Sequence, residues 1–428
     1  MTLVIVGAQW GDEAKGKIVD YVSDKAEYVA RYSGGNNAGH TVVANGVEFK
    51  FHLLPAGVLH PHSVSILAAG MVVCPRSLVR ELDETLAKQP EIGKVVISRG
   101  AHVVLPYHMS LDALEEEARG ADKIGTTSRG IGPAYTDKVQ RSGIRMAEFV
   151  DEDLFRSRLQ SVLGAKTRLF GLFGKTPPSF DEVFEEYRGY ADRLRPYVGD
   201  SEAMLQDAVA SGKRVLMEGA QGTFLDLDLG TYPFVTSSHP VAGGACIGTG
   251  IGPRDITGVL GVCKAYTTRV GTGPFPTELG NDIGEQIRRQ GHEFGTTTGR
   301  PRRCGWLDLA ALRFSARANS FSGLVVTRLD VLSGVGPLQV ATRYRLDGKD
   351  LPGVPMCSHE WARVEPVYET LPGWEGEMGS ARKLEDLPAE TRDYVRFIED
   401  CSGVPAAILS IGPGREQTIV LRPDLVWG

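Results

Sequence analysis

The sequence predicts an α/β protein with a large, mostly parallel central sheet flanked by helices, similar in type to the P-loop NTPases. Short apolar runs recur along the chain and alternate with amphipathic stretches, as in doubly wound sheets. Several runs end in polar or glycine-rich loops, and open α/β sheets bind ligands at these strand ends. The first run, residues 3–6, leads into Gly-Asp-Glu-Ala-Lys-Gly-Lys at 11–17, a pattern typical of phosphate loops.

In the first hundred residues, the apolar runs alternate with helical patterns. We expect a short helix at 17–22 after the first loop and an amphipathic helix at 76–86. Asn45-Gly46 supplies the positive φ angles of a hairpin turn. The strands expected in this part are 3–6, 27–31, 64–68 and 94–98.

The middle of the chain is predicted to be helical. Residues 106–118 and much of 151–198 have periodic apolar residues, so we expect a helical insertion at roughly 100–200 within a single domain spanning 1–428. Antiparallel elements are expected from Leu338 onward, with Asp347-Gly348 as a hairpin turn. Further strands are expected at 214–217, 258–262 and 323–327.

Composition restricts the classes of partner and the location. The chain has 428 residues, 42% of them hydrophobic and 23% charged, as in soluble globular proteins. Its net charge of −6 gives no support for a nucleic-acid or anionic-membrane partner. No apolar run approaches the roughly 20 residues of a membrane span, and no signal peptide precedes the first strand. Six scattered cysteines predict reduced thiols and a cytoplasmic location. His60, His62 and Cys74 have the wrong spacing for a structural zinc site.

The first loop departs from the phosphate-loop pattern at its metal ligand. Ile18 stands where the motif has a Ser or Thr whose hydroxyl binds Mg²⁺. Asp12 is the obvious substitute ligand. A carboxylate inside a phosphate loop indicates chemistry in addition to binding.

Four further loops carry polar groups suited to nucleotides. Segment 33–41 combines glycines and two Asn residues with His40, and segment 125–133 offers hydroxyls for a phosphate. Gln221, directly after an expected strand, can both donate to and accept from a purine, and Thr236 follows nearby. Segment 296–303 concentrates three arginines and three threonines, which predicts a mobile anion-binding loop that closes over its ligand.

The segment Thr327-Arg328-Leu329-Asp330 follows an expected strand. It is similar to the Lys-x-Asp guanine readers of GTPases. An Asp carboxylate in this position accepts hydrogen bonds from N1–H and the 2-amino group of guanine, which adenine does not offer together.

In combination and order, these loops resemble the adenylosuccinate synthetase family along essentially the whole chain. The matching segments are Gln9-Trp10-Gly11-Asp12-Glu13-Ala14-Lys15-Gly16-Lys17, Gly130-Ile131-Gly132-Pro133-Ala134-Tyr135 followed by Lys138 and Arg141, Glu218-Gly219-Ala220-Gln221-Gly222-Thr223, Gly230-Thr231-Tyr232-Pro233 and Thr297-Thr298-Gly299-Arg300.

The resemblance implies a reaction and a catalytic set. GTP phosphorylates the 6-oxygen of IMP, and L-aspartate then displaces the phosphate to give adenylosuccinate, as in de novo AMP synthesis. Asp12 is implied as the base that removes the N1 proton of IMP and as a ligand of Mg²⁺, the expected cofactor. His40 is implied as the acid that stabilises the transferring γ-phosphoryl group. Gly39 offers a carbonyl to the metal, and Lys15 and Gln221 complete the catalytic set.

The resemblance also implies three substrate sites, and a homodimer in which Arg141 reaches the neighbouring subunit's site. The residues implied for the IMP site are Asp12, Glu13, Ala14, Lys15, Asn37, Ala38, Gly39, His40, Thr127, Arg141, Gln221, Thr236 and Arg300. For GTP they are Gly11, Asp12, Glu13, Ala14, Lys15, Gly16, Lys17, Gly39, His40, Thr41, Arg302, Arg328, Leu329, Asp330, Ser410, Ile411 and Gly412. For aspartate they are Thr296, Thr297, Thr298, Gly299, Arg300, Pro301 and Arg302.

The chain departs from the family pattern at a few positions. Ala14 stands where the family usually has Gly, and we predict a negative φ there, because a left-handed Ala costs on the order of 1 kcal/mol. Arg328 replaces Lys and stacks better on a base. Pro301 stiffens the anion-binding loop at 296–303. Ser128 and His239 also differ from the common residues.

Three alternatives remain open from the sequence. The first is a GTP-hydrolysing switch or simple phosphotransferase, disfavoured by the missing hydroxyl at Ile18 and by the extra polar loops. The second is a purine-nucleotide-binding regulator without activity, disfavoured because both Asp12 and His40 are present. The third is a related synthetase that uses another purine monophosphate, which the lining of the pocket would decide.

Overall fold

The computed structural model describes residues 1–44, 46–295 and 299–427. Its centre is a ten-stranded sheet in which nine strands run parallel and only the edge strand β20 runs antiparallel to its neighbour. This confirms the predicted fold class. In sheet order the strands are β20 (Thr418–Val420), β19 (Ala406–Ser410), β15 (Gly323–Thr327), β11 (Gly258–Lys264), β1 (Thr2–Gly7), β10 (Val215–Glu218), β2 (Tyr28–Arg31), β5 (Val64–Leu67), β7 (Lys94–Ser98) and β9 (Val198–Gly199).

The middle strands of this sheet are buried on both faces. Successive side chains of a strand point to opposite faces, and β1 contributes Leu3 and Ile5 to one hydrophobic cluster and Val4 and Val6 to another. A strand buried on both sides reads as a continuous apolar run, which is why these strands could be predicted from the sequence. The two clusters are the cores of the two layers that cover the sheet.

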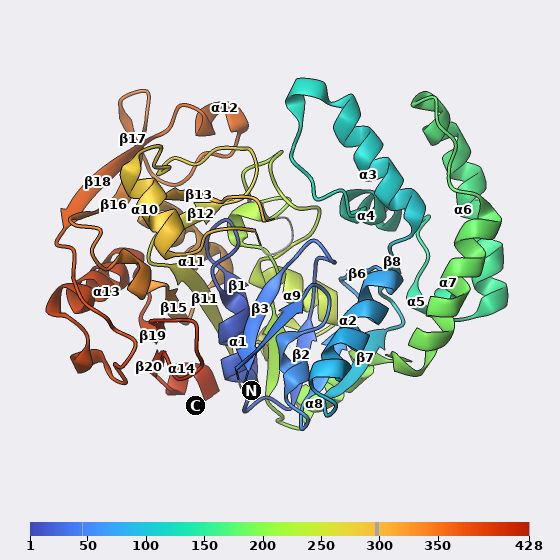
Figure 1. Cartoon of the computed structure of the whole chain (residues 1–428), viewed down its shortest axis with the longest axis horizontal. Coiled ribbons are helices and arrows are strands. Elements are labelled where there is room, and N and C mark those ends of the chain that lie inside the picture. The colour runs from blue at the N-terminus through green and yellow to red at the C-terminus, as the bar shows by residue number, and fades with distance from the viewer. Residues whose placement is uncertain (45, 296–298, 428) are drawn as a thin grey trace.

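Helices cover the sheet and extend beyond it on one side (Figure 1). There, α3 to α7 occupy the range in which the helical insertion was predicted, and side chains of Asp151 and Ser179 cap the first turns of α6 and α7. The first five helices are α1 (Lys15–Ser23), α2 (Pro75–Lys88), α3 (Pro106–Ala118), α4 (Ile131–Gln140) and α5 (Met146–Phe149). The others are α6 (Glu152–Leu172), α7 (Phe180–Leu194), α8 (Ser201–Ala210), α9 (Ala242–Thr249), α10 (Asp282–Gln290), α11 (Leu309–Asn319), α12 (Ser358–Trp361), α13 (Ala389–Ser402) and α14 (Asp424–Trp427).

Short strand pairs, most of them antiparallel and two of them parallel, lie outside the main sheet. The predicted hairpin at Asp347-Gly348 joins β16 to β17, and both turn residues have positive φ. The first predicted hairpin joins β3 to β4, although its turn residue Asn45 lies outside the described residues. The strands outside the main sheet are β3 (His40–Ala44), β4 (Val47–Phe51), β6 (Val72–Val73), β8 (His102–Val103), β12 (Thr267–Arg269), β13 (Arg303–Gly305), β14 (Leu307–Asp308), β16 (Leu338–Leu346), β17 (Lys349–Leu351) and β18 (Glu365–Leu371).

The antiparallel elements predicted from Leu338 onward are confirmed in the β16–β17, β16–β18 and β19–β20 pairs, but one of these strands has a parallel neighbour as well. β19 returns to the central sheet and pairs parallel with β15. The helix α13 precedes it, so the segment is a crossover connection of the kind that parallel strands require. The apolar run of β19 is fully buried, as a strand covered on both faces should be.

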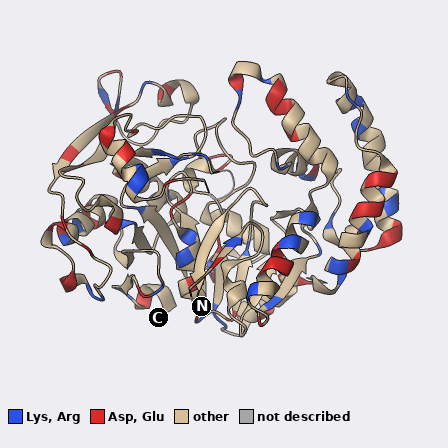
Figure 2. Ribbon diagram, in the orientation of Figure 1, with Lys and Arg blue, Asp and Glu red and all other residues tan. Residues whose placement is uncertain are grey.

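The surface is mixed in charge. Lys and Arg alternate with Asp and Glu along the outer helices α6 and α7, without a separate basic face there (Figure 2). Among the described residues, no helix has both the length and the apolar character needed to cross a membrane.

Candidate functional site

Six neighbouring strands of the sheet end at one edge and carry the predicted site loops. In sheet order they are β19, β15, β11, β1, β10 and β2. The phosphate loop follows β1, Gln221 follows β10, the loop with Asn37 and His40 follows β2, and Asp330 follows β15. Because parallel strands present their carboxyl ends together, loops far apart in the sequence converge here.

The phosphate loop is held in shape by Glu13. Its Oε1 accepts hydrogen bonds from the backbone N–H groups of Gln9 (3.0 Å) and Gly11 (2.9 Å), and its Oε2 pairs with Lys15 Nζ at 2.5 Å. Both charged side chains are buried. The helix α1 begins at Lys15 without a side-chain cap from Ala14, so its first turn presents donors of the kind that bind phosphate.

The prediction of a negative φ at Ala14 is wrong, because its φ is +64°. Gly11 and Asp12 also have positive φ, +88° and +60°. The Glu13 carboxylate folds back inside the loop, and this contact fixes a left-handed turn before α1. Contacts within the loop therefore override the intrinsic preference of Ala, at a cost on the order of 1 kcal/mol.

Backbone strain is concentrated in the predicted site. Among the described residues, nine non-glycine residues have positive φ. Residues held in this region mark places where the surrounding structure imposes a conformation, often for function. Five of the nine are predicted site residues, namely Asp12, Ala14, Arg141, Gln221 and Arg328.

His40 is paired with a buried carboxylate. Its Nδ1 lies 2.6 Å from Glu218 Oε1, and the other oxygen of Glu218 accepts a hydrogen bond from the backbone N–H of Ala56 at 2.9 Å. Gly16 allows this close packing, because a Cβ there would lie 2.9 Å from His40 Cβ. Since Nδ1 faces the carboxylate, Nε2 is the ring nitrogen left to face a ligand.

Asp12, which is partly exposed, is joined to a chain of buried charges. Arg302 Nε donates to Asp12 Oδ2 at 2.7 Å, and Arg302 Nη1 donates to Glu293 Oε2 at 2.7 Å. Glu293 Oε1 accepts from Lys264 Nζ at 2.7 Å and also from Tyr266. Burial alone would raise the pKa of Glu293, but the charges of Lys264, Arg302 and Arg328 lower it to about 2. Arg302 thus lies directly on the predicted base, in the segment predicted to bind anions.

The predicted guanine end of the site lies between β15 and β19. Asp330 Oδ1 is buried and has no hydrogen-bond partner among the described residues, and burial raises the pKa of this carboxyl. Lys17 Nζ donates to Ser410 Oγ (2.8 Å) and to the carbonyls of Gly412 (2.7 Å) and Gln417 (3.0 Å). Burial lowers the pKa of Lys17 to about 8. The lysine of the phosphate-loop pattern therefore contacts the C-terminal turn of the predicted guanine site.

Among the residues predicted to bind IMP, Asn37 contacts Thr236, and the side-chain oxygen of Gln221 is available to accept a hydrogen bond. Asn37 Nδ2 lies 3.5 Å from Thr236 Oγ1. Gln221 Oε1 is buried and, within the described part of the chain, accepts no hydrogen bond. The Ala38 carbonyl is held by His52 Nδ1 at 2.6 Å. These groups lie on the loops after β2 and β10 and leave an acceptor for an incoming donor.

Other predicted residues are not gathered into this buried group. Thr127, Arg141 and Arg300 are exposed. The loop before Thr127 is nevertheless connected to the His40 loop, since Arg129 Nη1 donates to the Asn36 carbonyl at 2.8 Å. The predicted aspartate residues Thr296, Thr297 and Thr298 lie outside the described residues.

The sequence assigns no role to several charged residues that shape the site. Arg31, the fully buried last residue of β2, donates to the carbonyls of Gly35 (2.9 Å) and His52. Glu218 is the last residue of β10, and Glu293 and Lys264 support Arg302. A charged residue ending an apolar strand is the signal that identifies Arg31, Glu218 and Lys264. Glu293 has no such signal.

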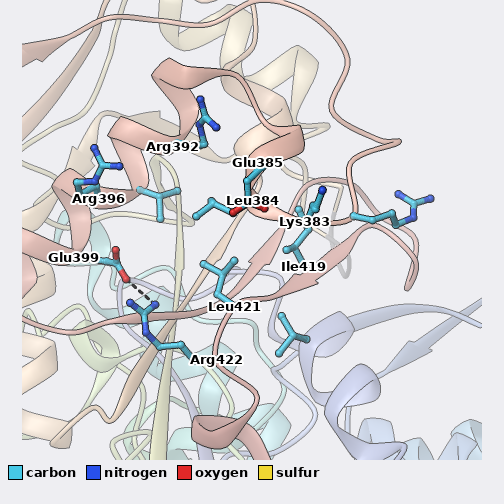
Figure 3. A pocket seen from close by; sticks show the side chains of 12 residues that line it. Lys383, Leu384, Glu385, Arg392, Arg396, Glu399, Ile419, Leu421 and Arg422 are labelled. Atoms are coloured by element: carbon cyan, nitrogen blue, oxygen red, sulfur yellow. Dashed lines mark ion pairs between the residues drawn. The ribbon is translucent and has the colours of Figure 1, made fainter.

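A separate cleft lies away from this site in the described structure. It has a volume of about 520 Å³ and lies between α13 and β20, and Arg422 pairs with Glu399 inside it (Figure 3). None of its lining residues is a predicted site residue. They are Arg382, Lys383, Leu384, Glu385, Arg392, Val395, Arg396, Glu399, Ile419, Val420, Leu421 and Arg422.

The fold and the loops at its strand ends place the chain among the α/β proteins that carry a phosphate-type loop after the first strand of a parallel sheet. The family can be stated from comparison with known proteins. The chain belongs to the adenylosuccinate synthetase family, whose model, described as adenylosuccinate synthetase, matches residues 4–419. It is therefore a ligase of purine biosynthesis that joins IMP and aspartate.

Relatives cover the whole chain. It is 53% identical to adenylosuccinate synthetase of Carboxydothermus hydrogenoformans, over 98% of this chain and 99% of the relative. It is 52% identical to that of Streptococcus sanguinis, over 100% and 99%. The structure of fully ligated adenylosuccinate synthetase from Plasmodium falciparum superposes with a TM-score of 0.93 at 37% identity, covering 98% and 99% of the two chains. A cyanophage S-2L succinoaminodeoxyadenylate synthetase, 19% identical with a TM-score of 0.62 over 99% and 97%, shares the fold.

Proposed function

We propose that this ligase uses GTP and Mg²⁺ to make adenylosuccinate, GDP and phosphate through a 6-phosphoryl-IMP intermediate. The observation that carries the proposal is the His40–Glu218 pair beside the loop of Asp12 at one edge of the sheet. A base, an acid and a phosphate loop on fixed strand ends are what phosphorylation of a carbonyl oxygen needs.

In the first step, Asp12 removes the N1 proton of IMP. Negative charge then builds on O6, which makes this oxygen a nucleophile toward the γ-phosphorus of GTP. In the structure, the Arg302 guanidinium donates a hydrogen bond to the Asp12 carboxylate. For Asp12 to act as a base, Arg302 must therefore leave it and bind an anion of the ligand instead. The planar guanidinium of Arg302 suits the carboxylates of aspartate.

His40 acts on the phosphoryl group during this transfer. The Glu218 carboxylate at Nδ1 orients the ring so that Nε2 is turned toward the ligand. A hydrogen bond from Nε2 would stabilise the charge that the transition state spreads over the phosphoryl oxygens. Lys15 and Gln221 are proposed to assist, Lys15 once a phosphate competes with Glu13 for its ammonium group.

Mg²⁺ fits the oxygen donors proposed for it. The Asp12 side chain is 30% exposed and supplies a carboxylate, and Gly39 supplies a carbonyl, both hard ligands that Mg²⁺ prefers. The ion, when bound, would neutralise phosphate charge during transfer. No Ser or Thr at position 18 is needed for this set.

Asp330 is proposed to read the guanine base. Its buried, unpartnered Oδ1 is costly unless a ligand donates to it. The turn formed by Ser410, Ile411 and Gly412 completes the base site, with Arg328 over the ring. The remaining predicted groups, including Leu329 and Thr41, would line the same nucleotide.

The exposed residues Thr127, Arg141 and Arg300 are proposed to complete the IMP and aspartate sites. Arg141 would do so from the second subunit of a homodimer. Gly299, Pro301 and the three threonines before them would close over aspartate. We further propose that the chain functions as a single domain in the cytoplasm.

An omission assay tests the proposal. The protein is mixed with IMP, GTP, aspartate and Mg²⁺, each left out in turn, and adenylosuccinate is followed by its absorbance. Product should require all four, and Asp12→Asn should abolish it. GTP turnover without IMP would instead favour a simple phosphotransferase. Product from another purine monophosphate but not from IMP would favour a related synthetase.

A further inference from the structure

We propose that Asp226, Asp228 and His239 form a binding site for a divalent transition-metal ion of the Zn²⁺ class. The three side chains each direct one donor atom to a common point, and these atoms all lie within 4.8 Å of one another. His239 Nδ1 is 3.4 Å from Asp226 Oδ2 and 3.9 Å from Asp228 Oδ2. The site is separate from the Mg²⁺ site proposed at Asp12, and its test needs no substrate.

An unused buried oxygen points to a ligand at this cluster. Asp226 is fully buried, and its Oδ1 accepts hydrogen bonds from the backbone N–H groups of Asp228 (3.0 Å) and Leu229 (3.1 Å). Its Oδ2 has no hydrogen bond from any described residue, and its contact with His239 Nδ1 is a longer one of 3.4 Å. A carboxylate oxygen out of contact with water costs free energy unless a partner approaches it. A cation between Asp226 and His239 would be that partner.

The spacing and chemistry of the donors suit Zn²⁺ and similar ions. Donor atoms bound to one ion at about 2.0–2.2 Å lie about 3.0–3.5 Å apart in octahedral or tetrahedral geometry. The contact between Asp226 and His239 already has this spacing. The Asp228 side chain is 76% exposed and is free to move closer by the small distance required. One imidazole with two carboxylates favours Zn²⁺, Co²⁺ or Mn²⁺ over Mg²⁺.

The Asp226 side chain and the backbone at His239 are held by the fold before any ion binds. The carbonyl of Pro240, directly after His239, accepts a hydrogen bond from Tyr32 Oη at 2.6 Å. Gly244 at the start of α9 packs on His239, since a Cβ there would lie 2.1 Å from the His239 carbonyl oxygen. Little conformational entropy therefore has to be lost at Asp226 and His239 when the ion binds.

The ion would join the two arms of one loop. Backbone hydrogen bonds already pair them, from Thr236 to Leu225 (2.8 Å) and from Leu227 to Ser238 (3.3 Å). Asp226 and Asp228 lie on the first arm and His239 follows the second. Because Thr236 contacts Asn37 in the proposed IMP site, the ion would act as a structural clamp beside that site.

Metal titration of the chelator-treated protein tests the site. Zn²⁺ is measured by competition with a chromogenic chelator and Co²⁺ by its visible absorption, in millimolar Mg²⁺ so that Asp12 is occupied. We expect one equivalent of Zn²⁺ to bind and to raise the melting temperature. His239→Asn and Asp228→Asn should each weaken binding by tenfold or more. Both side chains are partly or largely exposed, so both variants should fold.

The matched control is His62→Asn, the same substitution at another exposed imidazole, which should bind Zn²⁺ like the wild type. Failure of the wild type to bind Zn²⁺, or equal binding by His239→Asn, would overturn the proposal and leave an ordinary ion pair. Binding that survives His239→Asn but is lost in Asp12→Asn would assign the ion to the nucleotide site instead.

Discussion

The residues at the sheet edge and the residues on the outer segments differ in how far they are prepared for their roles. Glu13, Lys15 and His40 are buried and already have charged or hydrogen-bonding partners. Thr127 and Arg141 are exposed, on segments that precede or follow helices outside the sheet. Under the proposed function, the chemical groups are preorganised, whereas part of substrate recognition would be assembled when ligands or a second subunit arrive.

The largest effect is expected from His40→Asn. Removing the acid that is proposed to contact the transferring group should lower kcat by roughly 10²–10⁴-fold, with a much smaller change in KM for IMP. The measurement is steady-state adenylosuccinate formation at saturating substrates. His292→Asn is the control, because His292 is exposed and its φ of +48° suits Asn. A kcat near that of wild type would remove His40 from the chemistry.

Lys17→Met is expected to act on nucleotide recognition. The ammonium group donates to three acceptors in the C-terminal turn, so its loss should loosen the base site and raise KM for GTP by about tenfold, or about 1.4 kcal/mol. The preference for GTP over ATP should fall in parallel. Lys25→Met, an exposed lysine after the same helix, is the control. A lower kcat with unchanged KM for GTP would instead indicate that Lys17 acts on the phosphates.

The smallest effect is expected from Ala14→Gly. Glycine adopts positive φ without strain, so this change should raise the free energy of unfolding by about 1 kcal/mol, measured by denaturant titration. Ala147→Gly in α5, where the backbone is helical, should lower it by a similar amount. A destabilised Ala14→Gly variant would show that the positive φ of Ala14 carries no cost.

The sequence predicts the fold and the position of the site better than it predicts the contacts inside the site. Buried strands such as β1 and β15 can be predicted because they are apolar throughout, and the site loops follow directly at their carboxyl ends. The φ of Ala14 depends on the Glu13 carboxylate folding back, and the role of Glu218 depends on a histidine 178 residues away. The first contact lies within one loop but follows no recognised sequence pattern, and the second arises only from the tertiary structure. The aspartate-binding role of Thr296, Thr297 and Thr298 stays a prediction, because these residues lie outside the described part of the chain.

The contrast between the two regions is tested most directly by comparing Glu218→Gln with Arg141→Gln in full kinetic assays. Gln keeps the shape of Glu218 but loses the charge that supports His40, so kcat should fall by about 10–100-fold while KM for IMP stays close to wild type. Arg141→Gln should raise KM for IMP about tenfold and keep kcat at saturating IMP. Circular dichroism and gel filtration establish that both variants are folded and report their oligomeric state. The reverse result, a KM effect from Glu218→Gln and a kcat effect from Arg141→Gln, would contradict the account.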